Sequence, residues 1–403
     1  MLKEEHNFDL MKVGVVVDND YINDGRVCKE VAFITERYEV DVLCLKYSKN
    51  AQKHSNMHPV FLPKKAKDIL FALSSWFPLY SFLWTRWIRK FVVENDIDVL
   101  HVHDLYMGPP ATAAIKKVNK DVKLILDLHE NFPATVATYG WTKGFPNKLL
   151  TRVSLWKKNE KGILFKSDRI IVLSDLYKKD LLVSYPSLKE ENIFIFPNVV
   201  DFSKFSSFAI DKTKVRDKRV TYLYFGIVAS RRGIFETLDC FKEALETNPN
   251  LLLRVIGPVD KADSLRFKKR ISTIELKDSI EYIPWIPLEE ILTELDRVDV
   301  CLAPFHNNEQ HNSGIANKIF QYMYAGKPVI VSDCKPQEEL VLNANCGRVF
   351  RTLDEYIVLL LEMAEDKVLR DQMGERGEAY LHSNYNSENH ANRLLQVYVS
   401  IDE

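Results

Sequence analysis

Short apolar runs rich in β-branched residues alternate with amphipathic stretches of helical length along nearly the whole chain. This alternation is typical of parallel β-sheets covered by helices. The first half predicts strands at Lys12–Asp18, Val40–Lys46, Asp98–His103, Lys123–Leu128, Arg169–Leu173 and Asn192–Phe196. The second half restarts the pattern and predicts strands at Val220–Phe225, Leu251–Ile256, Ser279–Ile283, Val298–Ala303, Pro328–Ser332 and Gly347–Phe350. The sequence therefore predicts an α/β protein with two successive parallel sheets.

The length of 403 residues is enough for two domains of about 200 residues each. The polar, aperiodic stretch Asp201–Arg219 predicts the linker, which gives an N-terminal domain at 1–203 and a C-terminal domain at 204–385. Apolar residues at helical spacing over Ser387–Ser400 predict a last helix. We expect this segment, 386–403, to pack back toward the N-terminal domain.

Composition narrows the functional classes. A net charge of −1 gives no overall attraction to nucleic acid, so no nucleic-acid partner is expected. The six cysteines lack the spacing of a zinc site, and several lie in apolar runs, which indicates buried thiols in a reducing compartment. Met1–Leu10 is polar and charged, unlike a secretory signal, and the cytoplasm is the expected location.

In open α/β sheets, ligands bind beyond the carboxyl ends of the strands, so the residues after each strand are the candidate site. The loop Asp18–Arg26 after the first strand has one glycine and no GxGxxG, which argues against an NAD enzyme. Two interpretations of this loop stay open. It is either a solvated loop that caps a helix, or part of a cleft floor formed by Asp24, Gly25 and Arg26.

Histidines and carboxylates follow two further strands. His103 and Asp104 end one strand, and His129 and Glu130 follow the other. A histidine at a strand end can donate a hydrogen bond to an oxygen that becomes negative as a bond breaks. Because His101 and His103 share one face of their strand, we expect His103 to reach the ligand and His101 to be structural. We interpret His129 as functional.

The second half carries a candidate phosphate site after its first strand. Gly226 ends the strand, and Arg231, Arg232 and Gly233 stand at a helix start. Backbone amides at a helix N-terminus and guanidinium groups both bind phosphate oxygens. A basic pair on the surface is the alternative interpretation.

A second candidate phosphate site is a loop that leads into a helix ending near Gly326. Free amides at such a helix start suit a diphosphate. The positions concerned are Ser313, Gly314, Ile315, Ala316, Asn317 and Lys318. Phe320, Met323 and Tyr324 have the spacing of core residues.

These motifs together resemble glycosyltransferase family 4. Asn317–Met323 followed by Gly326–Ile330 is similar to that family's NKxFEYMxxGKPVI signature. Supporting matches along the chain are Arg26-Val27 with Lys29-Glu30, His103-Asp104-Leu105, Asp127-Leu128-His129-Glu130, Pro197-Asn198 with Val200-Asp201, and Gly226 with Arg232-Gly233. The resemblance implies the GT-B fold, in which two Rossmann-like domains with parallel sheets face an interdomain cleft.

The resemblance also implies an activity, that of a retaining glycosyltransferase. Such an enzyme moves a sugar from a nucleotide-diphosphate donor to a hydroxyl of a glycan or lipid-linked acceptor, here in surface polysaccharide or glycolipid assembly. A UDP- or GDP-sugar is favoured over an ADP-sugar, and neither a cofactor nor a metal is expected.

By this resemblance, each candidate residue has an implied role. His129 would stand beside the anomeric carbon, and Arg232, with Arg231, would hold the donor diphosphate. Lys318 and the amides of 313–316 would approach the phosphates, and Gln321 would face the ribose. The donor-binding set is Gly226, Arg231, Arg232, Ser313, Gly314, Ile315, Ala316, Asn317, Lys318 and Gln321. The acceptor-side set is Asp24, Gly25, His103, Asp104 and Glu130.

Two positions depart from the family. Ser313 and Gln321 stand where the family commonly has glutamates. An amide oxygen accepts fewer strong hydrogen bonds from ribose hydroxyls than a carboxylate, so Gln321 is expected to weaken donor binding by about 1–2 kcal/mol. A non-catalytic sugar-nucleotide-binding protein and a GT-B epimerase therefore stay open, and so does a phosphorylase that would require a pyridoxal-phosphate lysine.

The stretch Ile69–Trp84 is uncharged and strongly apolar, and 64–90 as a whole is a candidate for peripheral contact with the inner face of the cell membrane. It is short for a membrane-spanning helix. Basic residues flank it at Lys64, Lys65, Lys67, Arg86, Arg89 and Lys90, and its candidate headgroup anchors are Trp76, Trp84 and Trp87. A second basic stretch contains Lys143, Lys148, Arg152, Lys157, Lys158 and Lys161. A buried helix pair is the alternative.

Overall fold

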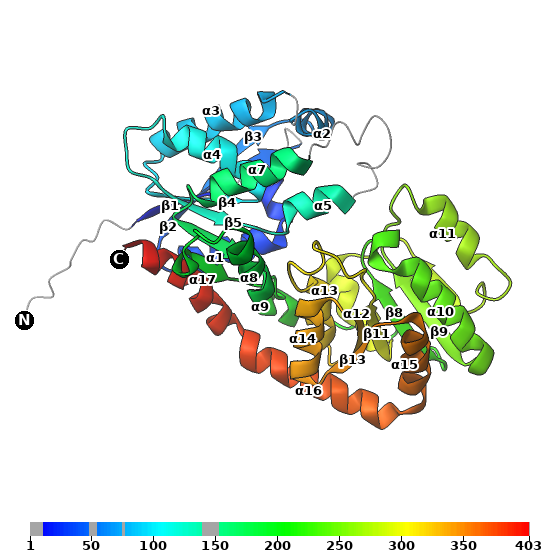
Figure 1. The fold of residues 1–403 in the computed structure, drawn as a ribbon. Helices are drawn as coiled ribbons and strands as arrows, with labels where there is room; N and C mark the ends of the chain where they lie inside the picture. Colours follow the sequence, from blue (N-terminus) through cyan, green and yellow to red (C-terminus); the bar gives the residue numbers. More distant parts are fainter. Residues whose placement is uncertain (1–10, 48–54, 75–76, 139–152, 403) are drawn as a thin grey trace, which may run out of the picture. The chain divides into compact units, whose positions relative to one another are not determined.

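A computed structural model describes residues 11–47, 55–74, 77–138 and 153–402. The chain divides into two compact units, shown in Figure 1. The first contains the residues up to Phe196 and those from His390 on, and the second contains Pro197–Asn389. Some residues named above lie outside the described ranges: Met1–Leu10, Trp76, Lys143, Lys148 and Arg152.

The first unit is built on a seven-stranded parallel sheet in the order β3-β2-β1-β4-β5-β6-β7. Its strands are β1 (Lys12–Val16), β2 (Glu39–Lys46), β3 (Met57–Phe61), β4 (Val99–His103), β5 (Lys123–Asp127), β6 (Arg169–Val172) and β7 (Ile193–Ile195). All the strands predicted for this half are present. The additional strand β3 lies at the edge of the sheet, where Pro59 is tolerated because one side of an edge strand makes no ladder hydrogen bonds.

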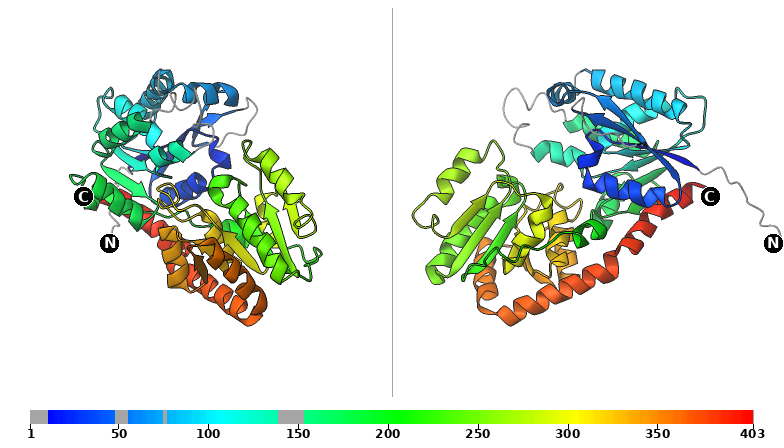
Figure 2. Two further views of the ribbon diagram at one scale, coloured as in Figure 1. Left: turned by 45° about the vertical axis from the view of Figure 1, so that its right-hand side comes forward. Right: turned by 180° about the vertical axis from the view of Figure 1, so that it is seen from behind.

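Helices cover both faces of this sheet. Val13, Val15 and Val17 point to one face, where they share a core with α1 and α17, while Val16 points to the other face and packs with α3 and α4. Figure 2 shows α17 alongside α1. The helices are α1 (Gly25–Thr35), α2 (Lys64–Ala72), α3 (Leu79–Glu94), α4 (Gly108–Ile115), α5 (Phe132–Thr138), α7 (Val153–Leu164), α8 (Asp175–Ser184) and α17 (Ser387–Asp402).

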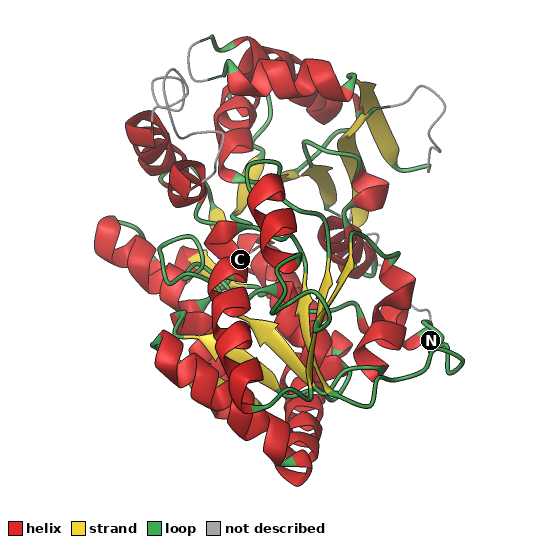
Figure 3. Ribbon diagram, turned by 90° about the vertical axis from the view of Figure 1, so that its right-hand side faces the viewer, coloured by secondary structure: helices red, strands yellow, loops and turns green. Residues whose placement is uncertain are grey.

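The second unit repeats this plan on a six-stranded parallel sheet in the order β10-β9-β8-β11-β12-β13. Its strands are the six predicted: β8 (Val220–Phe225), β9 (Leu251–Ile256), β10 (Ile280–Ile283), β11 (Val300–Ala303), β12 (Val329–Ser332) and β13 (Gly347–Phe350). Figure 3 shows helices on both sides of its strands. They are α9 (Phe202–Ser206), α10 (Ile234–Thr247), α11 (Ser264–Ile271), α12 (Ile291–Asp296), α13 (Asn317–Tyr324), α14 (Lys335–Ala344), α15 (Leu353–Glu365) and α16 (Lys367–Tyr385).

The two units divide after Phe196, a few residues before the predicted linker at Asp201–Arg219. The segment that follows belongs to the second unit, since its apolar residues are buried in the core of that unit: Val199, Val200 and Phe205. The predicted last helix is present as α17, and its residues from His390 on group with the first unit.

Each sheet has one point where the strand order reverses, between β1 and β4 in the first unit and between β8 and β11 in the second. The chain leaves the two central strands toward opposite sides there, which opens a crevice at the carboxyl edge of the sheet. The candidate residues follow these same strands, so each sheet gathers its own set at one edge.

Candidate functional site

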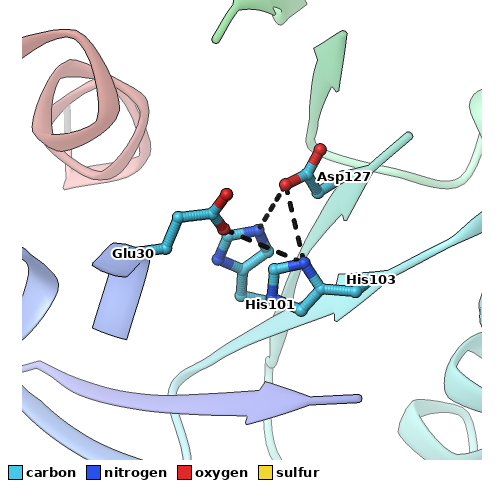
Figure 4. Close-up of side chains that lie close together, drawn as sticks. All are labelled: Glu30, His101, His103 and Asp127. Carbon is cyan, nitrogen blue, oxygen red and sulfur yellow. Dashed lines mark ion pairs between the residues drawn. The ribbon is translucent and has the colours of Figure 1, made fainter. Parts of the chain in front are cut away.

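Four ionisable side chains meet beneath the carboxyl edge of the first sheet, as Figure 4 shows. They are Glu30 of α1, His101 and His103 of β4, and Asp127 of β5. All four are buried, and each offers a ligand atom within 4.8 Å of the others. This set of side chains could in principle bind a metal ion.

Arg26 argues against that use. Its Nη2 lies 3.0 and 2.8 Å from the two oxygens of Asp127, and its Nε lies 2.8 Å from Oε1 of Glu30. Although burial alone would lower the pKa of Arg26, these carboxylates raise it. Since the guanidinium already pairs with both carboxylates, a divalent cation at this position would meet a fixed positive charge. The donor set therefore does not fit a metal.

The same contacts overturn one interpretation made from the sequence. Arg26 does not form the floor of a cleft, because it is buried and pairs with Asp127 at the end of β5. Asp24 caps α1 by accepting a hydrogen bond from the backbone N–H of Val27 at 3.1 Å. Gly25 is exposed at the helix start.

His129 lies directly above this buried cluster. Its Nε2 is 2.9 Å from Nδ1 of His103 and 3.4 Å from Oδ2 of Asp127, while its Nδ1 is 3.8 Å from Oδ1 of Asp104. Its side chain keeps 19 % exposure, so one edge of the ring is accessible. Burial favours the neutral ring, but the charges of Asp127 and Asp104 raise the pKa of His129 to about 9.

Asp104 has a backbone conformation that residues other than glycine rarely adopt, with φ +71° and ψ 142°. Two contacts hold it there: its N–H donates to the carbonyl of Asp127 at 2.8 Å, and Tyr106 Oη donates to its Oδ2 at 3.0 Å. Such strain is found mainly at functional sites. It leaves Oδ1 of Asp104 facing His129.

The expectation that His103 reaches the ligand is wrong for the described structure, because this side chain is buried beneath His129. His101 is buried as well, and its Nδ1 lies 2.6 Å from the Tyr398 hydroxyl of α17. Glu130 is half-buried, and its carbonyl accepts a hydrogen bond from Tyr177. His129, Asp104 and Glu130 therefore remain candidates with some access at this edge, as do Asp24 and Gly25 at the start of α1.

In the second unit, a turn at Ser230–Arg232 joins β8 to α10. Gly226 has φ +111° and Gly233 has φ +74°, which are conformations that favour glycine. Nη1 of Arg232 comes within 3.6 Å of the position of a β-carbon on Gly226. The positive φ angles of the two glycines shape the turn that carries Arg232 at the end of β8.

Arg231 and Arg232 have different surroundings. Nη1 of Arg231 lies 2.9 Å from Oδ2 of Asp260, which holds it in an ion pair. The guanidinium of Arg232 lies 5.8 Å from the centre of the Phe305 ring, beside the loop that follows β11. Its position beside this loop keeps Arg232 a candidate phosphate ligand.

Lys318 lies at the same edge. Its Nζ is 4.7 Å from the ring centre of Tyr224 and 4.6 Å from that of Phe305. This nitrogen is buried and has no hydrogen-bond partner in the described part of the chain. Burial, and secondarily the charge of Arg232, holds the pKa of Lys318 well below its usual range. An unpaired buried amine beside an arginine suits a bound anion.

The start of α13 completes this edge. No side chain caps the helix at Ala316, and Asn317 is exposed. Ser313 is buried, and its hydroxyl donates to the carbonyl of Gln310 at 2.7 Å, which shapes the preceding loop. Gln321 is buried too, and its Oε1 lacks a hydrogen-bond partner among the described residues.

Sequence reasoning missed several members of these sites. Phe305 and Tyr224 flank Lys318, and Asp260 fixes Arg231, but none of the three stands in a recognisable motif. Their positions at or just after the carboxyl ends of β8, β9 and β11 were the available signal.

Comparison with known proteins agrees with this geometry. Two Rossmann-like units, each with its polar residues at the carboxyl edge of a parallel sheet, define the GT-B class of glycosyltransferases. Residues 31–204 match the family described as Glycosyltransferase Family 4, and residues 206–380 match Glycosyl transferases group 1. The chain belongs to this glycosyltransferase family, as its motifs predicted.

Individual relatives are distant. The capsular polysaccharide biosynthesis glycosyltransferase CapM of Staphylococcus aureus is 22% identical over 251 residues. That match covers 57% of this chain and 60% of the length of CapM.

Solved structures show the fold over nearly the whole chain. Sucrose-phosphate synthase from Thermosynechococcus elongatus is 15% identical with a TM-score of 0.75, covering 97% of this chain and 99% of that one. HepE from Anabaena in complex with UDP-glucose is 13% identical with a TM-score of 0.67, covering 97% and 100%.

Proposed function

We propose that this protein is a retaining glycosyltransferase that moves a sugar from a nucleotide-diphosphate donor to a hydroxyl of a glycan or lipid-linked acceptor. The observation that carries the proposal is the cationic edge of the second unit. There Arg232 and the buried, unpaired amine of Lys318 lie against one aromatic side chain, Phe305. A diphosphate would supply the hydrogen-bond acceptors that the Lys318 amine lacks, and its charge suits the neighbouring guanidinium of Arg232.

In this account the donor binds to the second unit. Arg232, Lys318 and the first amides of α13 take the diphosphate oxygens, with Gly226 in the turn that carries Arg232 and with Gln321 facing the ribose. These groups stabilise the charge that develops on the leaving diphosphate. HepE, a relative by fold, is described in complex with UDP-glucose, which favours a nucleotide-sugar donor with a uracil base.

The acceptor binds to the first unit, beside His129, Asp104 and Glu130. Transfer with retention requires the acceptor hydroxyl to attack the face from which the diphosphate departs, and the diphosphate takes the hydroxyl proton. The carboxyl edges of the two units must then face a common cleft in the working enzyme, which stays a prediction.

A donor panel tests this function. The purified protein is incubated with UDP-, GDP- and ADP-sugars and with glycan and polyprenyl-phosphate acceptors. We expect nucleoside diphosphate release that depends on acceptor, and proton NMR of the product should show the anomeric configuration of the donor. Release without any glycosidic product, or an inverted product, would contradict the proposal.

Gln321 favours one second candidate, a protein that binds sugar nucleotides without transferring the sugar. Its unpaired buried Oε1 accepts fewer ribose hydrogen bonds than a carboxylate would. Donor binding without turnover across the panel would select this candidate. Recovery of turnover in Gln321→Glu would show that the amide is the cause.

We further propose a peripheral contact of α2 and α3 with an anionic lipid surface at the cytoplasmic side of the membrane. Several apolar side chains here are exposed: Ile69, Leu73, Phe77, Leu79 and Phe82. The adjacent groove on α3, about 530 Å³ in volume, is lined by Phe82, Arg86, Arg89, Lys90, Val93 and Lys117 among others. Apolar groups beside cations suit an anionic bilayer interface.

Two observations limit this contact. Trp84 is wrong as a headgroup anchor, because it is buried in the core with Ile88 and Phe91. Within the described ranges, no helix has the length and apolarity that a bilayer crossing requires. The described part of Ile69–Trp84 thus fits both interpretations made from the sequence, with some apolar side chains in the core and others exposed.

Vesicle flotation tests the lipid contact. We expect the protein to float with phosphatidylglycerol vesicles and to stay behind with phosphatidylcholine. Phe82→Ser should reduce flotation at least fivefold, while Val183→Ser, a change at a side chain with 80% exposure on α8, should not. A wild-type protein that never floats refutes the contact.

A further inference from the structure

One oxygen in the first unit faces an unusual number of nitrogens. Oδ2 of Asp127 lies 3.4 Å from Nε2 of His129, 3.5 Å from Nδ1 of His103 and 4.0 Å from Nε2 of His101. Nη2 of Arg26 lies 2.8 Å from the same oxygen. Although burial favours the protonated acid, Arg26 holds the pKa of Asp127 well below its usual range. Asp127 is therefore a fixed negative charge under three imidazoles.

His101 and His103 lie deeper than His129 and differ from it in their surroundings. His101 is fully buried, and burial holds its pKa well below the usual range, so its ring stays neutral. The Tyr398 hydroxyl lies 2.6 Å from Nδ1 of His101, and Nε2 of the same ring lies 4.0 Å from Oδ2 of Asp127. His103 is buried, with its Nδ1 against His129.

His129 is the member of the group that keeps an accessible edge. Its Nε2 faces Asp127 and its Nδ1 faces Asp104, so each nitrogen has a carboxylate on its own side. The charged and titratable groups around it come from α1, β4, β5 and the loops next to them: Asp24, Arg26, Glu30, His101, His103, Asp104, Asp127 and Glu130.

We propose that Asp127, locked by Arg26, is a positioning residue that keeps His129 doubly protonated through the neutral pH range, so that His129 acts as a hydrogen-bond donor and not as a general base. This inference rests on the proposed function for its catalytic meaning. The charge state itself does not depend on any substrate.

The consequence for the reaction is a definite proton path. The acceptor O–H bond breaks, the new C–O bond forms, and the bond from the anomeric carbon to the diphosphate oxygen breaks. The acceptor proton goes to the leaving diphosphate, because His129 already carries both of its protons. Nδ1–H of His129 is then free to donate to an oxygen of the bound substrate, with Asp104 as its partner in the resting state.

Histidine NMR on the ligand-free protein tests the charge state. The signals of His129 are assigned by their loss in His129→Gln, and the ring is titrated from pH 5 to 10. We expect its pKa at about 9 in the wild type and near 6.5 in Asp127→Asn. Asp121→Asn, an exposed carboxylate that precedes β5, is the control and should change nothing.

Kinetics gives the second readout. With an ordinary pKa of about 6.5, only about one tenth of His129 would be protonated at pH 7.5, so kcat of Asp127→Asn should fall about tenfold there and recover near pH 5.5. KM for the donor should change less than kcat, since the donor diphosphate is bound by Arg232 and Lys318 of the other unit.

A wild-type titration near 6.5, or an unchanged pKa in Asp127→Asn, overturns the inference. Should this variant fail to fold, the wild-type titration alone decides. A pKa near 9 in a protein without transferase activity would sink the proposed function and leave the charge state standing.

Discussion

Gly233 lies so close to Pro304 that a β-carbon on it would come within 1.8 Å of the Pro304 carbonyl oxygen. This contact joins the start of α10 to the loop after β11, across the point where the strand order of the second sheet reverses. Any larger residue must push apart the two segments that carry Arg232 and Phe305.

Gly233→Ala should therefore damage the donor site. The clash and the positive φ of 74° together predict a loss of at least about 2 kcal/mol in the free energy of unfolding. Urea denaturation measures this loss. Gly25→Ala is the matched control, because a β-carbon there meets nothing within 4 Å, and it should be neutral or slightly stabilising. Equal behaviour of the two variants would contradict the close packing.

Arg26→Met should be strongly destabilising. It leaves the buried carboxylates of Asp127 and Glu30 without their cation, and breaking a buried pair in this way costs about 3–5 kcal/mol. Arg37→Met, at an exposed arginine just after α1, should stay within about 0.5 kcal/mol of wild type. Denaturant midpoints of the two variants decide the matter, and a loss below about 1 kcal/mol for Arg26→Met would argue that the pair is not formed.

Lys318 gives the ligand-free protein a specific pH dependence. Its pKa is depressed in the folded chain, so the unfolded chain binds more protons in the interval up to the ordinary lysine pKa of about 10.4. Stability from this group must then rise as pH increases. Between pH 7 and pH 9, the free energy of unfolding of the wild type should therefore increase relative to that of Lys318→Met. A difference between the two proteins that stays constant over this range would show that Lys318 is not buried as described.

Much of the fold could be predicted from the sequence because parallel strands are apolar on both faces. All twelve predicted strands were recognisable as short β-branched runs. The strand β3 was not, since Met57–Phe61 contains His58 and Pro59 and lies at a sheet edge. The helix α9 within the predicted linker was not recognised, because it is short and mostly polar, although it buries Phe205.

The sites were predictable only in part. Motifs identified His129 and Arg232, because strand ends and helix starts can be located in a sequence. The pairing of Arg26 with Asp127 joins residues 101 positions apart, and that of His101 with Tyr398 joins residues 297 apart. No local pattern records such contacts, so the sequence could not show that His103 is buried and that Arg26 is structural.

Isothermal titration calorimetry with UDP and GDP tests the central claim most directly. Wild type should bind at least one of these diphosphates, and Arg232→Ala should bind it about ten- to a hundredfold more weakly, as expected when a charge-assisted hydrogen bond worth about 1.5–3 kcal/mol is removed. Arg376→Ala, a matched change on α16, should bind like wild type. Unchanged affinity in Arg232→Ala, or binding of neither diphosphate, would contradict the account.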